Sequence, residues 1–528
     1  MGAGRTPHVL PPLVRHARAW DTYRRFSPFH PVGALVTSSL FRTKSIDKLL
    51  ADSSATGEGA LKRTLGPWAL VFLGIGAIIG AGLFVRTAAA IADRAGPSVT
   101  IAFMVAGLGC AFAGLCYAEF ASMIPIAGSA YTYSYATMGE LVAWIIGWDL
   151  VLEYAVGAAT VAIAWTEYFN NVLGFFGWHI PYAWTHSPFE TALQTGEHGI
   201  MNLPAVFILA ALSALLVRGT QESAFVNGLI VVVKSAIVLL VIAIGWGFIN
   251  PANHTPYIPA PTEYTAPSGI VHHFGGILGI LGAAGVVFFA YIGFDAVSTA
   301  AQEAKNPKRD MPIGILGSLV VCTVLYVLFA HVLSGVATVE DFRTQGREAS
   351  VAYAIMTYMP GFAWLAKLVT VAILAGFSSV ILVMLLGQSR VFYSMSRDGL
   401  VPPIFSAVHP RFQTPYKSNI LFFFLTAAFA AFIPGDVVGE MTSIGTLFAF
   451  ILVCAGVWIM RVRRPDVPRG FTVPALPFVA TMGMLVCGAM IFGLGWTNWL
   501  RLIAWLALGM VFYFGYGRRH SALARGDA

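Results

Sequence analysis

Long apolar blocks separated by short polar stretches dominate the chain. The blocks lie near residues 66–93, 98–124, 140–170, 202–218, 224–249, 275–300, 313–338, 361–396, 417–434, 438–461, 473–495 and 497–517. Each can cross the hydrocarbon core of a bilayer as an α-helix, which takes about 17–25 residues. The pattern predicts an all-α, polytopic membrane protein with about 12 transmembrane helices.

The composition agrees with this prediction. Of 528 residues, 57% are apolar and 11% are charged, whereas a soluble domain carries charge on about a quarter of its residues. So few charges cannot cover a water-facing surface, which excludes a soluble globular protein. All five cysteines lie inside the apolar blocks, where we expect buried free thiols rather than disulfides.

The basic residues predict the orientation in the membrane. If the N-terminus is cytoplasmic, 25 Lys and Arg residues fall on the inside and five on the outside. Basic residues gather in cytoplasmic loops, so we expect both termini to be cytoplasmic and the protein to lie in the cytoplasmic (inner) membrane. The net charge of +7 therefore requires no nucleic acid. Two lysines, Lys234 and Lys367, fall inside apolar blocks, where charge is costly.

The boundaries of the membrane domain follow from the same pattern. Residues 1–60 contain many arginines and several prolines, and we expect a flexible basic cytoplasmic tail; a basic amphipathic anchor on the inner membrane face is the alternative. Residues 61–517 form the expected transmembrane domain, and residues 518–528 form a short cytoplasmic C-terminal tail.

The first apolar block is rich in glycine at its centre. Residues 74–84 read GIGAIIGAGLF. One interpretation is close helix packing, because Gly76 and Gly80 form a GxxxG pair. The other is an unwound segment whose backbone N–H groups hold an anionic ligand. The glycines alone leave both open.

The sixth block has a similar interruption. Residues 288–295 read FFAYIGFD, with a glycine and an acid at mid-depth. Interrupted first and sixth spans are typical of two inverted repeats of five helices, with the ligand site between the repeats; two extra helices would then follow. Free N–H groups at one interruption can hold a carboxylate, and carbonyls freed at both can accept from an ammonium group. A ligand with both groups is an α-amino acid.

Five motifs together resemble a known family. They are residues 74–84, residues 288–295, AKNPKRDMPI at 304–313, GQSR at 387–390 and SRDGL at 396–400. The combination resembles the amino acid-polyamine-organocation (APC) superfamily, and within it the bacterial branch of the cationic amino acid transporter (CAT) family. The resemblance spans residues 45–517. It implies a transporter of amino acids that needs no cofactor, with the amino acid, protons and the lipid bilayer as partners.

The resemblance also implies a substrate site. It matches the carboxylate-binding amides to the four residues Ile79, Gly80, Ala81 and Gly82. The carbonyls that receive the amino group match Ile75 and Ile78 in the first span, and Phe288, Ala290 and Tyr291 in the sixth. The Phe288 ring would gate the bound substrate; the alternative is a core or lipid-facing phenylalanine.

Lys234 is the expected centre of proton coupling. An apolar surrounding disfavours the charged form of an amine, so Lys234 can gain and lose a proton at ordinary pH. The resemblance implies that this lysine stands in for the sodium ion of sodium-coupled relatives, with Ser378 and Ser379 as hydroxyl neighbours. The alternative is a structural lysine paired to carbonyls.

Three acids inside the apolar blocks are further candidates. We expect Glu119, toward the inner end of the second span, to have a structural or gating role, and Glu153 to contact substrate or proton. Asp295 is expected to position the sixth helix, with the cavity as the alternative. The histidines of the long external loops have no metal-ligand spacing, so we expect them to be solvated and predict no metal site.

Met384 matches a position that lines the family's side-chain pocket. A bulky apolar residue there leaves little room for a guanidinium group, which favours a neutral L-amino acid over arginine or lysine. The sequence therefore predicts a secondary active transporter that is proton-coupled. An arginine/lysine carrier, an amino acid exchanger and a non-transporting sensor are alternatives. No HExxH motif or repeated filter supports an enzyme or a channel.

Overall fold

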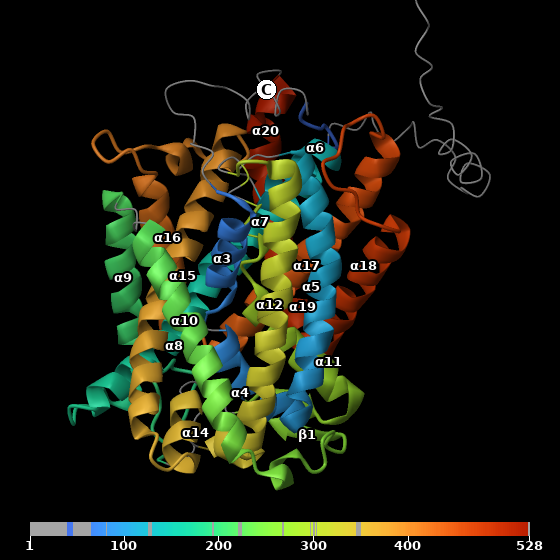
Figure 1. Cartoon of the computed structure of the whole chain (residues 1–528). Helices are drawn as coiled ribbons and strands as arrows, with labels where there is room; N and C mark the ends of the chain where they lie inside the picture. The colour runs from blue at the N-terminus through green and yellow to red at the C-terminus, as the bar shows by residue number, and fades with distance from the viewer. Residues whose placement is uncertain are drawn as a thin grey trace, which may run out of the picture.

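The computed structural model describes residues 40–45, 65–80, 82–124, 129–192, 195–219, 224–266, 269–295, 297–298, 301, 304–344 and 350–525. The described part is a bundle of helices that run between two ends of the molecule (Figure 1). One end carries α6 and α20, and the other carries β1 and α14. The helices follow from the long apolar blocks, because apolar side chains can face both the bundle interior and the lipid.

The described residues contain eight helical stretches that are long and apolar enough to cross a membrane, and four shorter apolar helices. The longer helices are α5 (Val99–Met123), α8 (Gly157–Gly174), α10 (Ala224–Gly245), α12 (Pro307–Val336), α15 (Ala363–Arg397), α17 (Gly435–Arg463) and α18 (Leu476–Gly493). The four shorter apolar helices are α3 (Pro67–Ile78), α9 (Leu203–Arg218), α11 (Gly276–Val287) and α16 (Tyr416–Phe432). Three further helices, α4 (Thr87–Ala90), α7 (Glu140–Val151) and α19 (Trp496–Phe512), are parts of the longer stretches. Every expected apolar block contains helix, which confirms a polytopic helical membrane protein.

Short elements connect these helices. They are α6 (Ser129–Thr137), α13 (Val339–Thr344), α14 (Ser350–Tyr358), α20 (Arg518–His520), α21 (Ala522–Arg525) and the 3₁₀- or π-helical turns η2 (Gly82–Arg86), η3 (Ile91–Ala95), η4 (Gly96–Ser98), η5 (Leu152–Val156), η6 (Tyr182–Trp184), η7 (Trp246–Phe248), η8 (Pro251–His254), η9 (Phe288–Tyr291), η11 (Pro403–Ser406) and η12 (Tyr513–Gly517). The expectation of an all-α fold needs one correction. The strands β1 (Thr262–Thr265) and β2 (Val271–Phe274) form an antiparallel hairpin. Their threonine, tyrosine, valine and phenylalanine residues favour extended backbone.

The first span is interrupted at the glycine-rich segment. The helix α3 ends at Ile78, and Ile79 has an extended backbone with ψ 99°. Helical structure resumes at Gly82 as the π-helical turn η2. Glycine lowers helix stability in a helix interior, so the local sequence accounts for the interruption.

The sixth span is interrupted at the predicted place as well. The 3₁₀ turn η9 follows α11, and Ile292 after it has an extended backbone with ψ 131°. Gly293 then has a φ of +115°, which a residue with a side chain rarely adopts. A Cβ atom at Gly293 would also lie 2.7 Å from the carbonyl oxygen of Ala77 in α3. Glycine is therefore required here both by conformation and by the close approach of the first span.

The glycines of the first span also pack closely against neighbouring helices. A Cβ atom at Gly74 would lie 2.6 Å from the Ser318 Cβ atom in α12, and one at Gly80 would lie 3.0 Å from Val380 in α15. Gly76 faces Val231 of α10 in the same way. The two interpretations of the glycine string are therefore compatible, because the same residues allow both the interruption and close packing.

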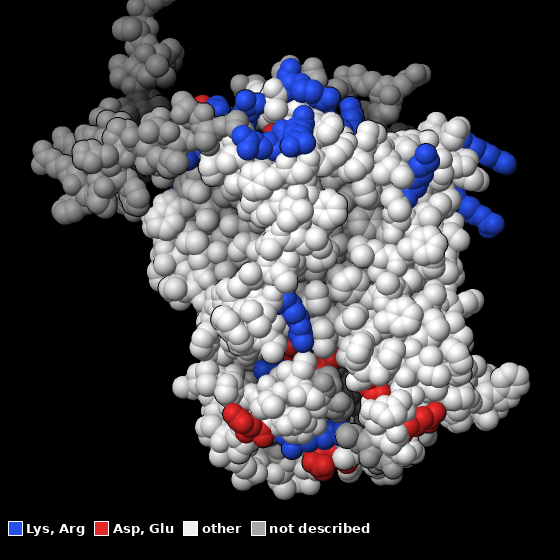
Figure 2. Space-filling view, turned by 180° about the vertical axis from the view of Figure 1, so that it is seen from behind, with Lys and Arg blue, Asp and Glu red and all other residues white. Residues whose placement is uncertain are grey.

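The two ends of the bundle differ in charge. Figure 2 shows Lys and Arg side chains gathered at the end that carries α20, and fewer basic and more acidic side chains at the end with the hairpin. At the basic end, residues 40–45 of the expected N-terminal tail lie against the start of α7: the Leu40 and Arg42 carbonyls accept hydrogen bonds from the Leu141 and Glu140 amides. The rest of the tail before residue 65 lies outside the described residues.

Candidate functional site

The two interruptions bring carbonyl groups from both spans to one hydroxyl group. Ile78 is the last residue of α3, and Ala290 lies in η9. The hydroxyl oxygen of Tyr326 in α12 is 2.8 Å from the Ile78 oxygen and 3.0 Å from the Ala290 oxygen. A phenol has one hydrogen to donate, so the two carbonyls share a single donor. Two of the expected acceptors for an amino group therefore lie at one point between the interruptions.

Other backbone groups of the first interruption are engaged within the helix. The Ile79 amide donates to the Ile75 carbonyl at 2.9 Å and closes the last turn of α3. In this conformation the Ile79 amide is therefore directed at its own helix rather than at a ligand. The Ile75 oxygen keeps a second lone pair that can accept another hydrogen bond. Ala81 lies outside the described residues.

Gly80 and Gly82 permit the close approach of the first interruption to its neighbours. A Cβ atom at Gly82 would lie 2.6 Å from the amide nitrogen of Ala290, and one at Gly80 would lie 3.0 Å from Val380. The two interrupted spans thus meet backbone to backbone at Gly82. A side chain at this position would push the two interruptions apart.

Phe288 and Tyr291 belong to an aromatic cluster. Phe288 is fully buried, and its ring lies edge-on to Phe450 of α17 with 5.4 Å between the centroids. The Tyr291 hydroxyl donates to the Phe103 carbonyl at 2.9 Å. In this conformation Phe288 packs as a core aromatic residue, which is the alternative to the gate role.

Lys234 lies beside the first interruption. It is 4% exposed, and it borders a small cavity of about 10 Å³, which has room for about one water molecule. The cavity is lined by Ile79, Gly80, Phe84, Lys234, Ile237, Ala372, Ile373, Gly376 and Phe377. A Cβ atom at Gly376 would lie 2.7 Å from the Lys234 Cε atom, so the absence of a side chain at this point of α15 makes room for the lysine.

The two expected hydroxyl neighbours of Lys234 do not border this cavity. The Ser378 hydroxyl donates to the Leu374 carbonyl at 3.1 Å and accepts from the Trp165 indole at 3.1 Å. Ser379 is buried in α15, one helical turn beyond Gly376. Ser378 therefore faces α8, on another side of α15 from the lysine.

Glu153 occupies a buried polar site in the interior of the bundle. It lies in the π-helical turn η5 between α7 and α8, and it is 1% exposed. Its carboxyl group lies beside Asp295, Asp149 and the Thr446 hydroxyl. The oxygens of Glu153 and Asp149 have no hydrogen-bond partner among the residues that the structure describes. The expected candidates Glu153 and Asp295 are thus brought together, and π-helical turns often occur at functional sites.

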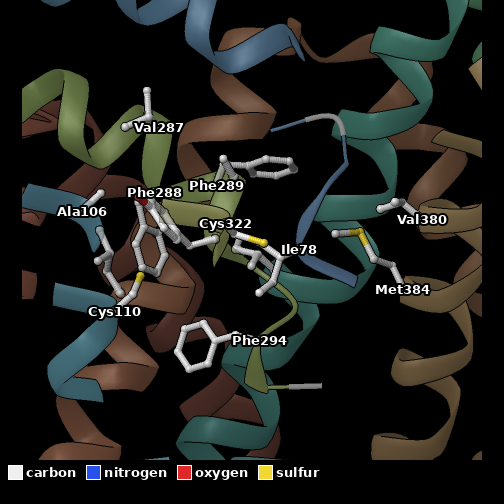
Figure 3. Packing of buried hydrophobic residues seen from close by; sticks show 14 of the residues in the cluster. Ile78, Ala106, Cys110, Val287, Phe288, Phe289, Phe294, Cys322, Val380 and Met384 are labelled. Carbon is white, nitrogen blue, oxygen red and sulfur yellow. The ribbon is translucent and has the colours of Figure 1, made fainter. Parts of the chain in front are cut away.

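Met384 lies on the face of α15 that points toward the interruptions. Figure 3 shows Ile78 between Phe288 and Phe294 on one side and Val380 and Met384 on the other. Met384 is buried, and its sulfur would lie 3.3 Å from a Cβ atom at Gly157 of α8. The side chains around the first interruption are therefore largely apolar on the α15 side.

A buried ion-pair network lies toward the hairpin end. Arg94 of η3 donates to Glu440 of α17 at 2.5 Å, and the two side chains are 2% and 3% exposed. Asn498 donates to the same carboxylate at 2.7 Å, and Arg501 lies 3.9 Å from it. The network ties the part of the first apolar block that follows the interruption to α17 and α19.

A second network lies toward the basic end. Glu119 of α5 accepts from Arg461, lies 3.2 Å from Arg469 and accepts from the Val473 amide at 2.8 Å. Glu119 therefore joins α5 to α17 and to the segment before α18, as expected for a structural residue. Lys44 pairs with Asp398 at 2.5 Å at the same end.

The expectation that the loop histidines are solvated is wrong for two of them. His272 of β2 is 4% exposed. The His186 ring stacks on Tyr182 with 3.7 Å between the centroids and lies 3.7 Å from Glu167. Burial lowers the pKa of His186 to about 4. His272 is thus buried and His186 is half-buried, and the sequence pattern shows neither.

Two residues of the site were not predicted from the sequence. Tyr326 is one tyrosine in an apolar span, where it looks like a core aromatic residue. Thr446 lies in an ordinary apolar helix, and only the fold brings it to Glu153. A signal for Tyr326 exists only in combination: a buried phenol requires a hydrogen-bond partner, and helix interruptions provide carbonyls that lack one.

Comparisons with known proteins agree on one family. The family model described as "Amino acid permease" matches residues 65–518. The chain is 43% identical over 485 residues to the branched-chain amino acid permease BcaP of Bacillus subtilis (strain 168), covering 92% of this chain and 99% of that protein. It is 40% identical over 486 residues to the methylthioribose transporter of the same organism, with coverage of 92% and 99%.

A more distant relative comes from a plant. The chain is 35% identical over 431 residues to the vacuolar cationic amino acid transporter 4 of Arabidopsis thaliana, covering 81% of this chain and 68% of that protein. These relatives are transporters, not enzymes. The matched region includes both interrupted spans and their neighbouring helices. The chain therefore belongs to the amino acid permease family within the APC superfamily.

Proposed function

We propose that this protein is a secondary active transporter that carries a neutral L-amino acid together with protons across the cytoplasmic membrane. The observation that carries the proposal is the meeting of the two interrupted spans, where the Ile78 and Ala290 carbonyls share one hydroxyl donor. An ammonium group has three N–H donors, so it can satisfy carbonyls that one phenol cannot. In the proposal, the amides at Gly80 to Gly82 receive the carboxylate after the first interruption rearranges.

The proposed arrangement in the membrane has twelve spans, of which the first ten form two inverted repeats of five. Both termini are cytoplasmic, with residues 61–517 as the transporter domain and short tails on either side. Two features support it: the interruptions lie in the first and sixth apolar blocks, and basic side chains gather at the end with α20 (Figure 2). Basic residues favour the cytoplasmic side.

The preference for a neutral side chain rests on Met384, Val380 and the apolar residues near the first interruption. A guanidinium group buried among them would lack a partner, which is costly. The similarity to a permease named for branched-chain amino acids points the same way. The buried acids Glu153 and Asp295 support the alternative, a cationic substrate, as does the similarity to plant cationic amino acid transporters.

Proton coupling in the proposal involves Lys234 and, as a second group, Glu153. Lys234 is buried beside the first interruption. A charged amine is unfavourable there while α10 and α15 enclose it. Loss or gain of its proton can therefore be linked to movement of the first span. Ser379 remains a proposed neighbour in other conformations, while Ser378 is engaged with Trp165.

The proposal is tested with purified protein in proteoliposomes. We expect labelled branched-chain amino acids to show counterflow, and a pH gradient to drive net uptake without sodium. Counterflow without gradient-driven uptake would identify an exchanger, and binding without counterflow would identify a sensor. Transport of methylthioribose alone, which lacks both the carboxylate and the ammonium group, would overturn the proposal.

The coupling and the pocket are tested separately. Lys234→Met should abolish uptake driven by a pH gradient, whereas Lys367→Met should not, because Lys367 is exposed and lies over the Phe175 ring. Met384→Ser should widen acceptance of arginine. Full gradient-driven uptake by Lys234→Met would contradict the coupling role, and an unchanged substrate profile would contradict the pocket assignment.

A further inference from the structure

Tyr326 is a buried residue of α12 that contacts both interrupted spans at the same atom. Its hydroxyl lies within hydrogen-bond distance of the Ile78 carbonyl of the first span and the Ala290 carbonyl of the sixth. Ile78 and Ala290 are 212 positions apart in the chain. One phenol therefore joins the two segments at the point where their helical hydrogen bonding stops.

Two neighbouring aromatic rings, those of Phe103 and Tyr291, hold the Tyr326 side chain in place. Its ring lies 5.6 Å from Phe103 of α5 and 5.4 Å from Tyr291, measured between centroids. The Tyr291 hydroxyl in turn donates to the Phe103 carbonyl at 2.9 Å. Offset and edge-on ring contacts hold aromatic side chains in one orientation. The Tyr326 hydroxyl is thus a fixed group toward which both carbonyls are directed.

Tyr326 supplies fewer hydrogens than the two carbonyl oxygens can accept. Two carbonyl oxygens face a phenol with one hydrogen, so at any moment one of the two accepts no hydrogen from Tyr326. A buried acceptor without a donor is destabilising. A primary ammonium group supplies three hydrogens and can serve both carbonyls at once.

We propose that Tyr326 is a positioning residue for the substrate amino group: its hydroxyl holds the Ile78 and Ala290 carbonyls together before substrate binds and releases them to the ammonium group. This rests on the proposed amino acid transport. In the substrate-free carrier, the hydroxyl stands where the ammonium group will donate. The hydroxyl keeps the two interrupted segments next to each other while the carrier returns to its starting conformation without substrate.

Two consequences follow for a carrier that lacks the hydroxyl. Both carbonyls lose their donor in the substrate-free state, so the amino acid has no competitor and binds more tightly. The empty carrier also loses the bond that joins the interruptions, so its return slows. Exchange, in which the carrier always returns loaded, does not depend on this step. A merely structural tyrosine would lower stability without separating net uptake from exchange.

The experiment uses Tyr326→Phe in the full-length protein, which keeps the ring and removes the hydroxyl. We expect the dissociation constant for the transported amino acid to fall about tenfold, the scale of a lost buried hydrogen bond. Binding of the carboxylic acid with the same side chain but no amino group should not change. Net uptake should fall relative to counterflow. The matched control is Thr370→Val, which removes a buried hydroxyl that donates to the Ala366 carbonyl of its own helix. Its dissociation constant and its ratio of net uptake to counterflow should match those of the wild type.

A second variant keeps the test valid if Tyr326→Phe does not fold. Replacing Tyr326 with 3-fluorotyrosine preserves the packing and makes the hydroxyl a stronger donor, so the dissociation constant should rise instead. Equal effects on the amino acid and its deaminated analogue, weaker amino acid binding by Tyr326→Phe, or an unchanged ratio of net uptake to counterflow would each overturn the proposal. Failure of counterflow in the wild type would instead reject the proposed function itself.

Discussion

Buried acids occur in two settings in this molecule. Toward the ends of the bundle, Glu440 is paired with Arg94 and Glu119 lies against Arg461 and Arg469. In the interior, Glu153 and Asp149 lie in and beside the π-helical turn η5 with Asp295 as a neighbour. Neither Glu153 nor Asp149 has a hydrogen-bond partner in the described part of the chain.

In the proposed function, this difference separates acids that hold the fold from acids that take part in transport. A buried carboxylate with an arginine is stable as an ion, because the partner compensates part of the lost hydration. A buried carboxyl group without an arginine lacks this compensation. The paired acids are suited to join helices permanently. The interior acids are suited to exchange protons when water reaches them.

The largest expected effect is on transport by Glu153→Gln. The amide keeps the shape of the side chain but cannot take up or release a proton, so net uptake driven by a pH gradient should fall to background. Thermal stability should change little, because no ion pair is lost. Uptake assays in proteoliposomes, with melting curves in detergent, test both statements. Normal transport by this variant would show that Glu153 is a structural acid and would contradict the distinction between paired and interior acids.

The next effect is on stability by Glu440→Gln. Removing one partner of a buried ion pair leaves Arg94 without its counter-charge, at a cost of about 3–5 kcal/mol. The unfolding free energy in detergent should fall by that amount. The control is Glu440→Gln combined with Arg94→Met, which removes both charges and should recover much of the loss. A loss no larger than that of an exposed pair, about 1 kcal/mol, would contradict the assigned role.

A smaller effect concerns pH at the hairpin end, where Glu167 faces His186 rather than an arginine, with Glu190 nearby. Burial lowers the pKa of His186 to about 4, whereas an unfolded chain has a histidine pKa of about 6.5. Between these values the unfolded state binds more protons at this histidine, so the contribution of His186 to stability should fall as the pH drops from about 6.5 to about 4, by up to roughly 3 kcal/mol. Above that window the contribution is constant.

This pH effect is measured by comparing melting curves of the wild type and His186→Phe. The substitution keeps an aromatic ring to stack on Tyr182 and removes the titrating group. The difference between the two proteins should therefore shrink in acid. If both lose stability in parallel between these pH values, the pH effect arises elsewhere and His186 does not titrate as inferred.

The smallest effect is expected from the exposed pair Arg464–Asp466. Its atoms lie 3.0 Å apart, but the side chains are 43% and 62% exposed. Water and salt screen such a pair, so Asp466→Asn should leave both the melting temperature and uptake unchanged. A clear loss of stability would show that exposed charge pairs at the basic end also stabilise the fold. The structural role would then not be specific to the buried pairs.

Much of the candidate site was accessible from the sequence because its signals are local. The glycines at 74–82 and Gly293 weaken or bend a helix wherever they stand, so the interruptions were predictable from their positions alone. Resemblance to the family singled out Lys234, Glu153 and Met384, which lie in α10, η5 and α15. The position of Ser378 was not predictable in this way, because residues one position apart on a helix face different neighbours.

The sequence by itself determined the membrane helices, the interruptions of the first and sixth spans and the free buried cysteines. These depend on hydrophobic length and backbone preference, which are properties of short stretches. Only the tertiary structure decided that Tyr326 serves carbonyls of both interrupted spans, that Glu440 pairs with Arg94 across 346 positions, and that His272 is buried. Each joins segments far apart in the chain, so the contact exists only once the helices have packed.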